Sequence, residues 1–164
     1  MFTLTSSQAL SGTGVTFEGV TIQGAKEIYK GYHHTKYVTF KDCQINDMIF
    51  LYSPTNFENC VFNSTAEHCV WTYSADEAIF KNCEFTYVDR AINVYGEHAV
   101  IAIDVLFENC KFNTENQLSL GAVEINSGMP NTISATVRMN NCTAPQFGEM
   151  AFIPRWDSSN GAKT

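Results

Sequence analysis

The sequence lacks several features that would place it in a common functional class. It has 10 basic residues against 17 acidic ones, no basic run, and a formal net charge of −7. This charge balance disfavours binding to nucleic acid or to an anionic membrane surface. No apolar stretch approaches the ~20 residues of a membrane span, so we expect no membrane insertion. The N-terminal segment lacks the basic and apolar regions of a signal peptide, which indicates a cytosolic protein or a segment of a longer chain.

Aromatic and aliphatic residues are plentiful instead. Hydrophobic residues make up 45% of the 164 residues, including 12 Phe and 7 Tyr. A chain of this length and composition is long enough to bury a sizeable core and is typical of one folded domain. The sequence therefore excludes a disordered polar tail.

One six-residue phrase recurs along the chain. It reads FKDCQI at 40–45, FENCVF at 57–62, FKNCEF at 80–85 and FENCKF at 107–112, with weaker copies FEGVTI at 17–22 and MNNCTA at 139–144. The copies begin 17 to 32 residues apart. Repetition at this period, with elastic spacing, is typical of a solenoid whose insertions lie in loops.

The third position of the phrase predicts a corner between two strands. It is occupied only by residues that tolerate a left-handed backbone, namely Gly19, Asp42, Asn59, Asn82, Asn109 and Asn141. Alternation on either side of the corner places Phe and Cys on one face and Lys, Glu or Gln on the other. Stacked coils would then form ladders of like residues, in which neighbouring Asn amides can hydrogen-bond.

Each coil has a second strand before its phrase. These segments align without gaps at 48–53, 69–74, 91–96 and 122–127. The second and fourth positions of each segment carry aliphatic residues or Thr72, and we place this parity inward: Ile49, Leu51, Val70, Thr72, Ile92, Val94, Val123 and Ile125. The other parity is aromatic or polar, and we place it outward: Phe50, Tyr52, Trp71, Tyr73, Asn93, Tyr95, Glu124 and Asn126.

Five of the six cysteines belong to the repeated phrase, where they alternate with Phe on the inward face. A small apolar filler suits that position, so we predict reduced core thiols. No CxxC pair occurs, and the histidines lack partner spacing for a metal, so we predict no metal site and no cofactor. The sixth cysteine, Cys69, falls on the outward parity.

The phrase resembles the coils of right-handed parallel β-helices in the pectate-lyase-like superfamily, over about residues 13–153. The resemblance implies an all-β, single-stranded, right-handed parallel β-helix (a solenoid) of about six coils. It also implies that the aromatic strands form the sheet whose outer face is the saccharide groove in family members. It implies no single activity, because this fold hosts lyases, hydrolases, esterases, phage tailspikes and adhesins.

The outward residues are the candidate ligand-binding residues. Aromatic faces stack on sugar rings, and the neighbouring polar residues can bind hydroxyl groups. Three interpretations stay open for this stripe: saccharide binding, packing under a loop, or burial against another subunit.

Charges at the starts of these strands are the candidate catalytic residues. Glu67 and Asp89 fall on neighbouring coils and could act as the carboxylate pair of a glycoside hydrolase. Alternatively, Asp89 and Arg90 could cleave uronides by elimination. The resemblance implies that Arg90 would then be the base and that Ca²⁺ would neutralise the substrate, although no acidic calcium cluster accompanies it.

We therefore expect a β-helix domain at 1–157 and a flexible C-terminal end at 158–164. The favoured function is non-catalytic binding of a saccharide or cell-surface ligand, by a module of a larger secreted or surface protein of bacterial, adhesin-like type. Neighbouring domains in a longer chain are expected, because isolated solenoids need caps. The alternatives are a polysaccharide lyase or glycoside hydrolase, and a structural stalk or assembly segment.

Overall fold

Short parallel strands build the whole described part of the chain. A computed structural model describes residues 14–24, 26–28, 37–65, 68–72, 75–95, 102–114, 122–125 and 134–144, with the side chains of 26–28 excepted. All 16 elements in these ranges are β-strands. The described residues contain no helix long and apolar enough to cross a membrane.

The strands form three parallel sheets. Sheet A contains β1 (Val15–Glu18), β4 (Val38–Lys41), β7 (Thr55–Glu58), β10 (Glu77–Lys81), β13 (Ile103–Glu108) and β16 (Ala135–Asn140). Sheet B contains β2 (Thr21–Gln23), β5 (Gln44–Asn46), β8 (Val61–Asn63), β11 (Glu84–Thr86) and β14 (Lys111–Asn113). Sheet C contains β3 (Lys26–Ile28), β6 (Ile49–Leu51), β9 (His68–Trp71), β12 (Arg90–Val94) and β15 (Val123–Ile125).

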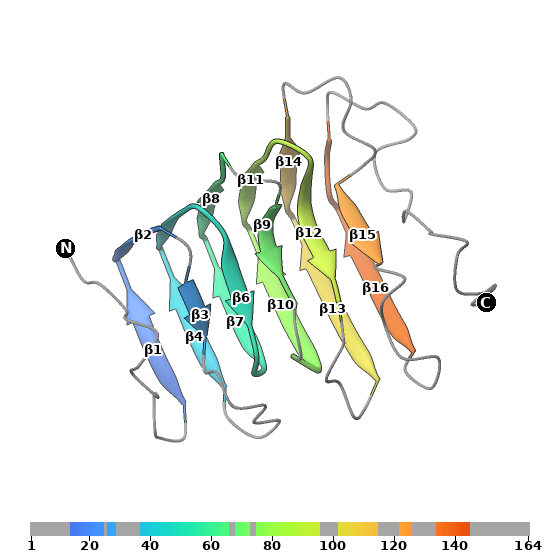
Figure 1. Cartoon of the computed structure of the whole chain (residues 1–164), viewed down its shortest axis with the longest axis horizontal. Helices are drawn as coiled ribbons and strands as arrows, with labels where there is room; N and C mark the ends of the chain where they lie inside the picture. Colours follow the sequence, from blue (N-terminus) through green and yellow to red (C-terminus); the bar gives the residue numbers. More distant parts are fainter. Residues whose placement is uncertain are drawn as a thin grey trace.

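Every third strand pairs with the next in the same sheet, so the chain winds as a right-handed parallel β-helix. Figure 1 shows the coils stacked side by side from β1 at one end to β16 at the other. The six strands of sheet A match the six copies of the repeated phrase, which confirms the predicted fold class and the number of coils.

The corner prediction is confirmed at every copy of the phrase. Backbone φ is positive at all six third positions: Gly19 (64°), Asp42 (52°), Asn59 (55°), Asn82 (53°), Asn109 (54°) and Asn141 (52°). Each corner joins a strand of sheet A to the next strand of sheet B, except that only an isolated bridge follows the last one. An L-residue with a β-carbon is strained there unless its side chain is short and polar, which explains the restricted residue choice.

The corner side chains bond to one another from coil to coil. Each amide nitrogen donates to the side-chain oxygen one coil below: Asn59 to Asp42 and Asn82 to Asn59 at 3.1 Å, Asn109 to Asn82 at 3.1 Å, and Asn141 to Asn109 at 2.8 Å. This row lies on the surface rather than within the core. The ladder therefore fixes the stacking register from outside.

We predict that replacing Asn82 with Val lowers the free energy of unfolding by about 1–2 kcal/mol, because a branched β-carbon resists positive φ. The substitution also removes the hydrogen bonds to Asn59 and Asn109. Asn82→Gly is the matched control, since it removes the same bonds without backbone strain. Urea titration should show Asn82→Val as the less stable variant; equal losses would contradict the corner interpretation.

Two columns of aromatic rings fill the core. In the first, Phe17, Phe40, Phe57, Phe80 and Phe107 stack at centroid distances of 5.0–5.2 Å. In the second, Phe62, Phe85 and Phe112 stack at 4.6 and 5.0 Å. Rings of the two columns meet edge to face, the arrangement that the aromatic quadrupole favours.

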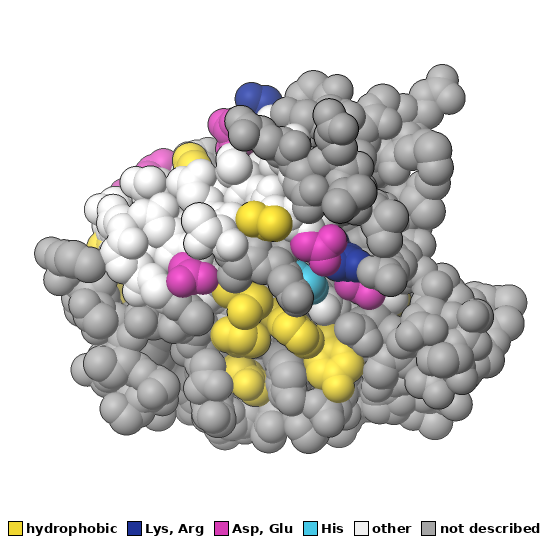
Figure 2. Space-filling view, turned by 45° about the horizontal axis from the view of Figure 1, so that its top comes forward, with side chains coloured by type: hydrophobic (Ala, Val, Ile, Leu, Met, Phe, Trp, Pro, Cys, Tyr) yellow, Lys and Arg dark blue, Asp and Glu magenta, His cyan; other side chains and the backbone are white. Residues whose placement is uncertain are grey.

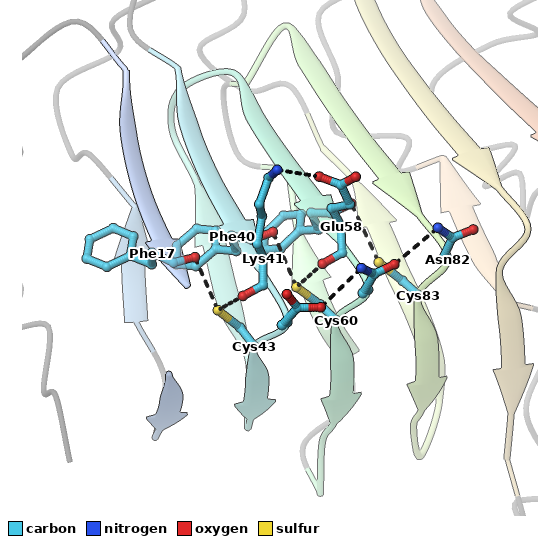
Figure 3. A network of polar contacts seen from close by, with 11 residues as sticks. Phe17, Phe40, Lys41, Cys43, Glu58, Cys60, Asn82 and Cys83 are labelled. Carbon is cyan, nitrogen blue, oxygen red and sulfur yellow. Dashed lines mark hydrogen bonds and ion pairs between the residues drawn. The ribbon is translucent and has the colours of Figure 1, made fainter. Parts of the chain in front are cut away.

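The repeat cysteines lie beside these columns as free thiols, as predicted; Cys43, Cys60, Cys83 and Cys110 are buried and Cys142 is half-buried. Each of the four buried thiols lies within hydrogen-bond distance of two carbonyls, to either of which its single proton can be donated. Cys60, for example, contacts the carbonyls of Phe40 and Glu58, both at 3.4 Å. Figure 3 shows both contacts at Cys43 and at Cys60, and Cys83 contacts the carbonyls of Phe57 and Lys81 in the same way. The thiols therefore satisfy backbone acceptors at the corners.

Candidate functional site

The outer face of sheet C carries one row of in-register side chains. Phe50 pairs with Trp71, Trp71 with Asn93, and Asn93 with Glu124. This is the register expected from sequence. The inward residues of the same strands are fully buried from Ile49 to Val94, and Val123 is 4% exposed. Strand pairing thus places the predicted outward residues side by side, about 4.8 Å apart.

Three half-buried rings on this face form what we call the aromatic patch: Phe50, Trp71 and Tyr95. Trp71 is central. Its ring stacks with Phe50 at 5.9 Å and meets Tyr95 edge to face at 5.7 Å. In Figure 2, hydrophobic side chains gather on one face beside a histidine, a basic side chain and acidic side chains. The patch therefore combines partly accessible aromatic surface with neighbouring polar groups.

A polar pair adjoins the patch. The ring of His68 stacks on Trp71 at 5.4 Å, and its Nε2 lies 2.9 Å from Nδ2 of Asn93. In this arrangement the amide NH₂ of Asn93 donates and the ring nitrogen accepts. Both side chains are almost fully buried, at 3% and 2% exposed. His68 thus fixes the orientation of both Trp71 and Asn93.

The first residues of β9 and β12 depart from strict alternation. The amides of Ala91 and Ile92 both donate to the carbonyl of Ala122, at 2.9 and 3.1 Å, the two-against-one pattern of a bulge. On the neighbouring coil, His68 pairs with Arg90 and Val70 with Ile92, which leaves Cys69 opposite Ala91. The outward placement of Cys69 was wrong: its side chain is 0% exposed, and Sγ donates to the carbonyl of Thr86 at 3.3 Å.

Beside the polar pair lie three charged side chains, which we call the charged cluster: Asp89, Arg90 and Glu124. The guanidinium of Arg90 contacts Asp89 through one terminal nitrogen, and its Nε lies 2.6 Å from Oε2 of Glu124. Arg90 is only 5% exposed, whereas Glu124 is 15% and Asp89 31% exposed. Solvent therefore reaches the carboxylates more readily than the cation between them.

The groups behind the site are uncharged at neutral pH. Burial raises the pKa of the Cys69 thiol above its usual range. Burial also raises the pKa of the Tyr87 hydroxyl, with a smaller contribution from Cys69. Both groups belong to the hydrophobic core. The charge of the described site therefore comes from the charged cluster.

The structure brings together seven of the residues chosen from sequence: Phe50, Trp71, Asn93, Tyr95, Glu124 and, at the strand start, Arg90 with its neighbour Asp89. Tyr52 is only 6% exposed and Asn93 2%, so neither offers much contact area in this conformation. Glu67, Tyr73 and Asn126 lie outside the described residues. Sequence reasoning missed His68 as a member of the site.

The described residues contain no group of three or more His, Cys, Asp or Glu side chains placed to hold a metal ion. A scan against models of known protein families, a search of curated proteins and a search of solved structures all found no match to this chain.

Proposed function

We propose that this chain is a non-catalytic saccharide- or surface-ligand-binding β-helix module, of the pectate-lyase-like superfamily, within a larger secreted or cell-surface protein of adhesin-like type. The aromatic patch carries this proposal. Phe50 and Trp71 lie on successive coils, with centroids 5.9 Å apart, and Tyr95 continues the group on the next coil. A sugar unit in an extended glycan has a similar length, so successive units could contact successive rings.

The charged cluster supports binding rather than chemistry. A glycoside hydrolase needs two carboxylates on opposite sides of the scissile bond. Of the carboxylate pair expected from sequence, Glu67 lies outside the described residues, and Asp89 is ion-paired with Arg90. The lyase alternative would need Arg90 as a base, but Arg90 is only 5% exposed and is ion-paired with two carboxylates, so it is not presented to a substrate. Both enzymatic alternatives therefore have less support than binding.

A glycan-array screen followed by affinity measurements on the strongest glycan tests the proposal. We expect Trp71→Ala to weaken binding by about tenfold, the loss of one well-stacked ring. The matched control is Tyr37→Ala, which removes an aromatic side chain that is 45% exposed next to sheet A. That variant should bind like the native protein. Equal affinities for all three proteins would contradict a role for the aromatic patch.

The stability of Trp71→Ala must be measured in parallel. Trp71 contacts Phe50, His68 and Tyr95, so we expect a loss of about 1–2 kcal/mol in the free energy of unfolding. Binding is then compared at a temperature where circular dichroism shows both proteins folded. If a glycan binds Trp71→Ala with the same affinity as the native protein under those conditions, the proposal is wrong.

A further inference from the structure

The described part of this molecule has few positively charged side chains. Each Lys and Arg side chain that the structure describes already lies in an ion pair with a carboxylate: Lys41 with Glu58, Lys81 with Glu108, Lys111 with Glu84, Arg138 with Asp104, and Arg90 with Asp89 and Glu124. Four of these pairs lie on sheets A and B. On sheet C, Arg90 is the described cation, and it faces two carboxylates.

The site on sheet C is consequently rich in hydrogen-bond acceptors. Asp89 and Glu124 supply four carboxylate oxygens for one guanidinium, and both are more exposed than Arg90. Asn93 lies in the row between Trp71 and Glu124, but its side chain is only 2% exposed, so the two carboxylates are the acceptors that a ligand can reach.

A ligand that matches this site must bring donors. Sugar hydroxyls donate to carboxylate oxygens, and hydrogen bonds to a charged acceptor are stronger than those between neutral groups. Carboxylate and sulfate groups only accept, so they would meet like charge, and every cation among the described side chains is already ion-paired. The charged cluster has one positive and two negative groups, a net charge of −1.

From this we infer that the site selects uncharged glycans and discriminates against acidic glycans with the same backbone. The inference rests on the proposed saccharide binding and specifies its substrate class. It sets the site apart from uronide recognition, for which a free cation would have to lie beside the aromatic rings.

The test uses pairs of polysaccharides that share a backbone and differ in charge. Suitable probes are highly methyl-esterified pectin against de-esterified pectin, dextran against dextran sulfate, and hydroxyethyl cellulose against carboxymethyl cellulose, together with neutral and sulfated or uronate-bearing glycans on an array. We expect the uncharged member of any bound pair to bind at least about tenfold more tightly at low salt, and the ratio to shrink as salt screens the cluster.

Glu124→Gln should reduce this ratio by about threefold, because it removes one of the two negative charges. Glu58→Gln is the matched control: it alters an ion-paired glutamate on sheet A and should leave the ratio unchanged. If Glu124→Gln fails to fold, Asp89→Asn replaces it. An acidic glycan that binds as tightly as its uncharged counterpart would overturn the inference alone. Binding to no glycan at all would overturn the proposed function, and the inference with it.

Discussion

Replacing Phe80 with Ala should lower the free energy of unfolding by about 3–5 kcal/mol, the cost of emptying a fully buried aromatic site. Phe80 is 0% exposed. Its ring stacks between Phe57 and Phe107, at 5.0 Å on both sides, and meets Phe62 and Phe85 edge to face. Both aromatic columns thus lose contacts at once. Urea denaturation followed by circular dichroism measures the effect.

Phe17→Ala provides the matched control for this prediction. Phe17 is the first described ring of the same column, is 8% exposed, and stacks with Phe40 at 5.2 Å. The same chemical change there should cost about 1–2 kcal/mol, because part of the site is open to solvent and can collapse. If both variants lose the same stability, the columns do not act as a continuous core, and the nearest-neighbour description of this solenoid fails.

The coil architecture could be predicted because one backbone constraint repeats. A corner with positive φ accepts few residue types, so Gly, Asp or Asn had to recur at the third position of the phrase. The phenylalanines on either side then followed from alternation, and the ladder Phe40–Phe57–Phe80 lies as the repeat predicts. The register of sheet C was predictable for the same reason, since the aliphatic positions of its strands align without gaps.

A second left-handed corner was not predicted. Asp47 has φ of 95°, and its carboxylate accepts from the amide of Met48 at 2.8 Å. Gly24, which precedes the corresponding strand one coil earlier, has φ of 75°. In the next coil Ser64 occupies this position without positive φ. The residue type therefore does not repeat, and sequence carries no periodic signal for the corner.

The composition of the candidate site depends on a local departure from alternation. Strict alternation places His68 inward with Val70 and Cys69 outward with Trp71. In the structure His68 stacks on Trp71 and Cys69 is fully buried, and β12 carries a bulge at which Ala91 and Ile92 both donate to the carbonyl of Ala122. Bulges arise from packing across coils rather than from the residues of one strand, so the sequence pattern could not reveal it.

Arg90→Met should lower the free energy of unfolding by about 3 kcal/mol, because it leaves two carboxylates without their cation in a largely buried site. Methionine keeps much of the length and apolar stem of arginine, so the loss reports charge rather than volume. Arg138→Met is the control. Arg138 and Asp104 are 54% and 45% exposed, and breaking that pair should cost less than about 1 kcal/mol.

A double variant separates charge from packing. Adding Glu124→Gln to Arg90→Met removes one of the two uncompensated charges, so we expect it to restore about half of the lost stability, on the order of 1–2 kcal/mol. Glu124→Gln alone keeps the pair between Arg90 and Asp89 and should cost less than Arg90→Met. Thermal and urea unfolding of the four proteins gives the coupling energy. If the second substitution restores nothing, the carboxylates do not depend on Arg90 for compensation, and the expected discrimination against acidic glycans loses its electrostatic basis.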